Sequence, residues 1–163
     1  MTPFRVLVVD DNTHIHRDFK RVVDTVTRAS SWSEVTPDPL ARSVSIPPPP
    51  VDLEVAFAES GEGAVALVSA ALTVQQPFHI AFVDMRMPGM DGLATVEQLW
   101  QTQPDLEVAF SSAYMDYSWN QVVERLQRPG LRLVPKPWTG SKILAVLHEL
   151  RGRVRDRGPR LPR

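Results

Sequence analysis

Five polar residues that could share one reaction stand at the ends of short apolar runs: Asp10, Asp11, Asp84, Ser112 and Lys136. Clustered carboxylates repel one another unless a cation lies between them, and an all-oxygen ligand set suits a hard ion such as Mg²⁺. A lysine charge and a serine hydroxyl both suit an anionic, oxygen-rich group. The chemistry that fits is transfer of a phosphoryl group to Asp84, with the metal and Lys136 neutralising charge in the transition state.

Each of these residues also has a purely structural explanation when it is taken alone. The pair Asp10 and Asp11 precedes a predicted helix and could cap it, where the helix dipole favours a negative charge. Asp84 could be a turn residue, Ser112 a loop hydroxyl and Lys136 a solvated side chain. Their placement at successive strand ends of one predicted sheet favours a shared site over these separate explanations.

The elements that must position these residues alternate between short apolar runs and longer stretches with helical spacing. Short, mainly apolar runs predict strands at residues 6–9, 53–57, 80–83, 106–110 and 131–134, and the first of them is continuously apolar and rich in β-branched residues. Apolar residues at helical spacing predict helices at residues 12–28, from 60 or 61 to 72, 93–101, 119–126 and 141–150. This alternation predicts a doubly wound α/β fold, in which ligands bind beyond the carboxyl ends of the parallel strands.

Two segments depart from that alternation. Residues 30–52 contain six of the 15 prolines and predict an extended insertion between the first helix and the second strand. Residues 151–163 carry six arginines and one aspartate, so we expect an Arg-rich flexible tail after a domain that spans residues 1–150. The tail could be solvated, or it could make an electrostatic contact with a partner.

Composition excludes several classes of protein. The chain has 163 residues, of which 43% are apolar, which is enough for one sizeable core. It has no cysteine, so disulfides, cysteine-bound metals and thiol catalysis are excluded. A net charge of −1 argues against a general grip on nucleic acid, and no apolar run is long enough to span a membrane. We therefore expect a cytoplasmic protein, and the lack of a glycine-rich phosphate loop after any strand disfavours a nucleotide-dependent enzyme.

Four segments in chain order resemble the signatures of response-regulator receiver domains of two-component systems. They are VLVVDDN at residues 6–12, AFVDMRMPGMDG at 81–92, SAY at 112–114 and PKP at 135–137. The resemblance covers essentially residues 4–150. It implies a CheY-like, flavodoxin-like sheet of five parallel strands in the order 2-1-3-4-5.

The resemblance also implies a role for each candidate residue. Asp84 would take a phosphoryl group from a phosphohistidine on a sensor histidine kinase or phosphotransfer protein. Four groups would hold Mg²⁺: Asp11 and Asp84 directly, Asp10 through water, and the backbone carbonyl of Arg86. Ser112 would hydrogen-bond the acyl phosphate, and Lys136 would form an ion pair with it. Such a domain catalyses its own phosphorylation and dephosphorylation without being a conventional enzyme.

The sequence departs from the family pattern near the predicted switch. Leu133 stands where the family usually has tyrosine or phenylalanine, so the coupling of the hydroxyl to an aromatic ring could be carried by Phe110 or Tyr114 instead. The Lys136–Pro137 peptide bond is expected to be cis, as is usual in the family.

Three functional interpretations remain open from the sequence. The first is a stand-alone receiver that switches contacts with a downstream protein target when Asp84 is phosphorylated. The second is a receiver that forms part of a hybrid kinase or multidomain regulator, with the Arg-rich end as the start of a linker. The third is an interaction module that does not depend on phosphorylation, which the complete set of site residues disfavours.

Overall fold

A computed structural model describes residues 3–28, 53–113 and 118–158 of the chain. The predicted insertion at 30–52 and Tyr114 lie outside the described residues, as does the end of the predicted tail. Within the described ranges, the elements alternate between strand and helix from β1 to α5.

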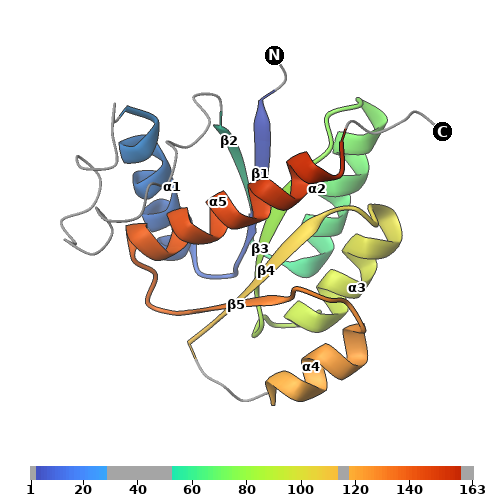
Figure 1. Cartoon of the computed structure of the whole chain (residues 1–163). Helices are drawn as coiled ribbons and strands as arrows, with labels where there is room; N and C mark the ends of the chain where they lie inside the picture. Colours follow the sequence, from blue (N-terminus) through green and yellow to red (C-terminus); the bar gives the residue numbers. More distant parts are fainter. Residues whose placement is uncertain (1–2, 29–52, 114–117, 159–163) are drawn as a thin grey trace.

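Five parallel strands form one sheet in the order β2-β1-β3-β4-β5 (Figure 1). They are β1 (Phe4–Val9), β2 (Leu53–Ala58), β3 (Ile80–Asp84), β4 (Glu107–Ser112) and β5 (Arg132–Pro135). All residues of β3 and β4 are buried, as expected for central strands that are covered on both faces. The fold class and strand order predicted from the sequence are confirmed.

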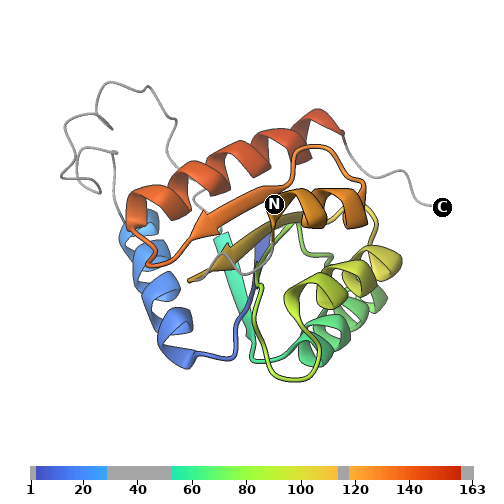
Figure 2. The same ribbon diagram turned by 90° about the horizontal axis from the view of Figure 1, so that it is seen from below.

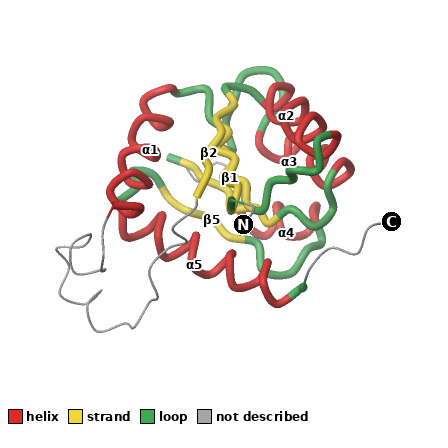
Figure 3. Tube along the Cα trace, turned by 90° about the horizontal axis from the view of Figure 1, so that it is seen from above, coloured by secondary structure: helices red, strands yellow, loops and turns green. Residues whose placement is uncertain are grey.

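The five helices cover both faces of this sheet (Figures 2 and 3). They are α1 (Thr13–Arg28), α2 (Gly61–Thr73), α3 (Gly92–Thr102), α4 (Trp119–Leu126) and α5 (Gly140–Asp156). Successive side chains of a strand point to opposite faces, so β1 contributes to two cores. Val6 and Val8 pack in the core that contains buried residues of α1 and α5, and Leu7 and Val9 pack in the core of α2 and α3.

Three helices begin at side-chain caps that the sequence supplies. Ser60, Asp91 and Thr139 accept hydrogen bonds from the backbone N–H groups of Gly63, Ala94 and Lys142. Such a cap satisfies one of the N–H groups that the first turn of a helix leaves unpaired, and it is worth about 1 kcal/mol. The caps of α3 and α5 fix where these two helices begin. Helix α3 follows β3, which carries Asp84, and α5 follows the segment that contains Lys136.

Helix α5 is longer than predicted, because it ends at Asp156 rather than at residue 150. Its last turns are held by arginine–glutamate pairs. Arg153 lies 2.7 Å from Glu149 and 3.7 Å from Glu107, and Arg157 also pairs with Glu107. Glu107 is the buried first residue of β4, so these pairs attach the end of the helix to the sheet. Residues 151–156 are therefore part of helix α5, although the sequence predicted a helix that ends at residue 150.

No helix in the described parts of the chain is both long enough and apolar enough to cross a membrane. The longest, α5, has 17 residues and carries five charged side chains in its second half alone: Glu149, Arg151, Arg153, Arg155 and Asp156.

Candidate functional site

The carboxyl ends of the parallel strands bring the predicted site residues to one edge of the sheet. Strand β1 pairs with β3 up to the contact of Val9 with Val83, and Asp10 and Asp84 follow these residues directly. On the other side, β4 pairs with β5 up to the contact of Ser112 with Pro135, which precedes Lys136. The edge therefore gathers residues from four segments that are far apart in the sequence.

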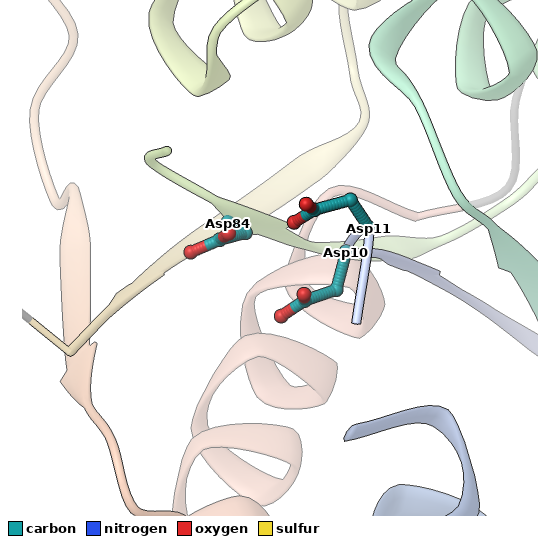
Figure 4. Close-up of side chains that lie close together, drawn as sticks. All are labelled: Asp10, Asp11 and Asp84. Atoms are coloured by element: carbon teal, nitrogen blue, oxygen red, sulfur yellow. The ribbon is translucent and has the colours of Figure 1, made fainter. Parts of the chain in front are cut away.

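Three carboxylates form a cluster at this edge (Figure 4). One oxygen of each of Asp10, Asp11 and Asp84 lies within 4.8 Å of an oxygen of the other two. Asp10 and Asp84 are buried, with 1% and 6% of their surface exposed, whereas Asp11 is exposed. The cluster thus has two acids fixed inside the protein and one that faces solvent.

Lys136 supplies the positive charge of the site. Its Nζ lies 2.6 Å from Oδ2 of Asp10 and 3.2 Å from Oδ1 of Asp84, and only 13% of its side chain is exposed. Its backbone N–H donates to the carbonyl oxygen of Ser112 at 2.9 Å, so the lysine is attached to the end of β4. One ammonium group is thus shared by two buried carboxylates that belong to different strands.

Asp10 uses both of its carboxylate oxygens within the protein. Oδ1 accepts a hydrogen bond of 2.9 Å from the backbone N–H of Asn12, and Oδ2 accepts the bond from Lys136. The first of these bonds also holds the turn into α1, where Asn12 Oδ1 accepts from the N–H of His14. Asp84 also contacts Lys136 and accepts a hydrogen bond from the backbone N–H of Arg86, so Asp11 is the member of the cluster that faces solvent.

The negative charge of the cluster affects the titration of Asp84. Burial raises the pKa of Asp84 above its usual value, and the nearby charge of Asp10 raises it further. Lys136 and a hydrogen bond from the backbone N–H of Arg86 act in the opposite direction and lower this pKa, but they do not cancel the increase. Burial is the larger of the two causes, so the ionised form of Asp84 is disfavoured mainly because water is excluded from it. When all three acids are ionised, they share the positive charge of Lys136.

The backbone that presents Asp84 depends on a glycine that the sequence analysis did not single out. The N–H of Gly92 donates to the carbonyl oxygen of Met85, and the N–H of Met85 donates to Ser111. A Cβ atom added to Gly92 would lie 2.3 Å from the carbonyl oxygen of Asp84 and 2.7 Å from Cα of Met85. Only glycine permits the first turn of α3 to pack this closely against the chain that carries Asp84.

Ser112 ends β4 at the expected edge and is 8% exposed. In the register of the sheet, the residue directly beside Asp84 is Ser111, whereas Ser112 pairs with Pro135. Since side chains alternate along a strand, the two serines face opposite sides of the sheet. The sequence prediction that Ser112 lies at the edge is therefore consistent with the structure, and its contact with a phosphoryl group stays a prediction.

Leu133 of β5, which stands where the family usually has tyrosine or phenylalanine, is partly buried. Leu133 pairs in register with Phe110 of β4, which is fully buried. The ring of Phe110 packs edge to face against Trp119 of α4, with centroids 6.2 Å apart. An aromatic pair between β4 and α4 was not predicted, because the two residues are joined only by the fold. The Lys136–Pro137 peptide bond is cis, as the resemblance implied.

A family model described as response regulator receiver domain matches residues 50–148. This range begins after α1, so the matched part does not include β1 or the pair Asp10 and Asp11 that follows it in the structure. The fold is similar to that of a CheY-like response regulator receiver domain protein from Methanospirillum hungatei JF-1. The TM-score is 0.68 and the identity 17%, over 96% of this chain and 99% of that one.

Two relatives with known names are much longer than this chain. The chain is 35% identical over 77 residues to the DNA-binding transcriptional regulator NtrC of Klebsiella pneumoniae, which covers 47% of this chain and 16% of the relative. It is 28% identical over 147 residues to the protein-glutamate methylesterase/protein-glutamine glutaminase of Trichodesmium erythraeum (strain IMS101), which covers 90% of this chain and 34% of the relative. The similarity therefore concerns one part of each relative. On the family match and the fold together, the chain belongs to the response regulator receiver domains, the signal-receiving domains of two-component systems.

Proposed function

We propose that this receiver domain accepts a phosphoryl group on a carboxylate oxygen of Asp84 and thereby switches its contacts with a downstream protein. The observation that supports this most strongly is the shared ammonium of Lys136, which lies 3.2 Å from Asp84 and 2.6 Å from Asp10. A positive charge beside a buried carboxylate can stabilise the negative charge that a transferring phosphoryl group brings. Family membership supports the same function.

The proposed reaction forms one bond and breaks one. An oxygen of the ionised Asp84 carboxylate attacks the phosphorus atom of a phosphohistidine, the P–N bond breaks, and the imidazole leaves with its electron pair. Lys136 then exchanges its contact with Asp84 for one with a phosphoryl oxygen, and the Ser112 hydroxyl donates to another. The product is an acyl phosphate on the carboxylate.

The donors of the cluster fit a magnesium ion. All three are carboxylates within 4.8 Å of one another, and Lys136 contacts two of them. We propose that Asp11, Asp84 and the backbone carbonyl of Arg86 hold Mg²⁺ directly. Asp10 would contribute through water, as the family resemblance implies, and both of its oxygens accept hydrogen bonds within the protein. When bound, the ion neutralises charge on the phosphoryl oxygens.

The proposed partners follow from this chemistry. The donor is a sensor histidine kinase or a phosphotransfer protein, and the acceptor of the signal is a protein target. A cytoplasmic location is part of the proposal. The same domain could instead belong to a larger regulator, and the relatives, of which this chain matches 16% and 34%, are consistent with that arrangement.

The proposal is tested by incubating the chain with acetyl phosphate and measuring its intact mass. We expect a mass increase of one phosphoryl group that requires Mg²⁺ and is lost in Asp84→Asn. The control is Asp18→Asn, which changes an exposed aspartate of α1 and should leave phosphorylation intact. An interaction module that does not depend on phosphorylation would show no Mg²⁺-dependent increase in either protein.

A further inference from the structure

Three aromatic side chains from three different elements pack against one another in the core between the sheet and helices α1 and α5. They are Phe19 of α1, Phe82 of β3 and Trp138, which lies between β5 and α5. Their ring centroids are 5.1 Å apart for Phe19 and Phe82, 5.7 Å for Phe19 and Trp138, and 5.9 Å for Phe82 and Trp138. All three pairs are edge to face, the arrangement that aromatic quadrupoles favour.

This aromatic triad joins the two chain segments that carry the central ion pair. Phe82 stands two residues before Asp84 on β3, and Trp138 stands two residues after Lys136. Phe19 and Phe82 are fully buried, so they form a fixed surface against which the indole of Trp138 rests. The packing of one ring therefore restrains the distance between the backbone near Lys136 and the strand that presents Asp84.

The other contacts of the same segment act at its two ends. The N–H of Lys136 donates to Ser112, and Thr139 caps α5 by accepting from the N–H of Lys142. Neither contact reaches β3 or α1. Besides the ion pair of Lys136 itself, the side chain of Trp138 attaches the segment to the strand of Asp84, because its ring packs against Phe82.

We propose that Trp138 is a positioning residue that holds the Lys136 ammonium in reach of both Asp10 and Asp84. The inference rests on the proposed phosphorylation of Asp84 and adds a residue that acts on this reaction without touching the phosphoryl group. A lysine held in place serves the transition state better than one that samples many positions, since misplacement of a charged group by about 1 Å costs up to about a hundredfold in rate.

The packing of the ring, rather than its polar atom, carries this role. The indole Nε1 of Trp138 is buried, and no acceptor is found for it in the described parts of the chain. Replacement by phenylalanine would therefore remove no hydrogen bond and would keep an edge-to-face contact with Phe19 and Phe82. Replacement by leucine keeps apolar volume but removes the aromatic contacts.

The test is a double-mutant cycle on the full chain, with the rate of acyl phosphate formation from acetyl phosphate at saturating Mg²⁺ as the readout. We expect Trp138→Leu to lower this rate about tenfold. In a Lys136→Met background the same substitution should change the remaining rate by less than about twofold, because its target is gone. The variant Trp138→Phe should keep most of the wild-type rate. Trp100→Leu, which removes a partly buried tryptophan of α3, should leave the rate unchanged.

Equal losses from Trp138→Leu in both backgrounds would overturn the proposal and would leave the function of Asp84 untouched. A second readout does not require phosphorylation. We expect Trp138→Leu, but not Trp138→Phe, to speed hydrogen exchange of the Lys136 amide about tenfold beyond the change in global stability. An unchanged exchange rate of the Lys136 amide would overturn the positioning role of Trp138. A wild-type protein that is never phosphorylated would instead contradict the proposed function of Asp84.

Discussion

The Lys136 ammonium lies closer to Asp10 than to Asp84, at 2.6 Å against 3.2 Å. The lysine therefore has its shorter contact with the more deeply buried acid, Asp10, and its longer contact with Asp84, the proposed phosphoacceptor. A phosphoryl group on Asp84 would offer additional negative oxygens to the same ammonium. In this structure one ammonium group is thus shared between two acids.

The excess negative charge predicts that neutralising Asp84 stabilises the protein. In Mg²⁺-free solution at neutral pH, we expect Asp84→Asn to raise the free energy of unfolding by about 1 kcal/mol, or roughly 2–4 °C in melting temperature. The reason is that the substitution removes a charge that burial and Asp10 disfavour. Thermal unfolding followed by circular dichroism measures this. A lower melting temperature for Asp84→Asn would contradict the proposed charge imbalance.

The same pKa shift predicts a pH dependence. Because the folded pKa of Asp84 is raised above 3.8, the folded state holds this proton to higher pH than the unfolded state does. The stability that Asp84 contributes is therefore fully present below pH 3.8 and is lost as the pH rises through the folded pKa. The difference in stability between wild type and Asp84→Asn should grow over that interval. A constant difference across it would show that the pKa of Asp84 is not raised.

Bound Mg²⁺ is expected to compensate the negative charge of the three carboxylates and so to stabilise the folded protein. A ligand that binds only the folded state at 100 times its dissociation constant stabilises it by about 2.7 kcal/mol. We predict that Mg²⁺ raises the melting temperature of the wild type and has a much smaller effect on Asp11→Asn, which loses an exposed carboxylate of the cluster. Asp105→Asn, which leaves the cluster intact, serves as the control. Equal stabilisation of all three proteins would place the ion elsewhere.

Much of this site could be predicted because the information is local. A short apolar run followed by an acid predicts a strand end, and parallel strands bring such ends to one edge. On that basis Asp10, Asp84 and Lys136 were placed together correctly, and α4 was predicted with the bounds that the structure shows. The sequence could not show which acid the lysine prefers, because that depends on how the strands are arranged in space.

Gly92 should tolerate no side chain. We expect Gly92→Ala to destabilise the protein by about 1–3 kcal/mol, because the added methyl group would meet the backbone of Asp84 and Met85. The phosphorylation rate should fall as well, since the strand end that carries Asp84 has to move. Chemical denaturation and intact-mass measurements follow the two effects.

A matched control for this substitution is available in α5. A Cβ atom added to Gly152 meets nothing within 4 Å, so Gly152→Ala should be neutral or stabilise the helix by up to about 1 kcal/mol. A Gly92→Ala protein as stable and as readily phosphorylated as Gly152→Ala would refute the close-packing argument.

The end of α5 is predicted to be part of the folded domain. The Glu107 side chain is 8% exposed and pairs with Arg153 and Arg157. Replacing both arginines by methionine would leave a buried carboxylate without these partners, which we expect to cost about 2 kcal/mol. Adding Glu107→Gln to that variant should recover part of the loss. Arg155→Met, an exposed change in the same helix, should have little effect. Full stability of the double arginine variant would mean that residues 151–157 do not anchor the helix.

The features that sequence analysis missed all depend on contacts that only the folded chain shows. The end of α5 is stabilised by pairs of Arg153 and Arg157 with Glu107 of β4. Because the sequence does not show these pairs, the arginines were interpreted as part of a tail. Gly92 matters only because the backbone of Asp84 passes beside it. The contact between the rings of Trp138 and Phe82 was not predicted, because only the fold brings these two residues together. In each case the missing information is a distance in space.

The central claim is that Asp84 carries the phosphoryl group, and mapping the modified residue tests it most directly. After reaction with acetyl phosphate and Mg²⁺, borohydride reduction converts an aspartyl phosphate to homoserine, which peptide mass spectrometry can locate. We predict a single modified peptide, with the change at residue 84 and only trace modification when Lys136 is replaced by methionine. Modification at Asp10 or Asp11, or no reducible acyl phosphate in a folded protein with Mg²⁺ bound, would contradict the account.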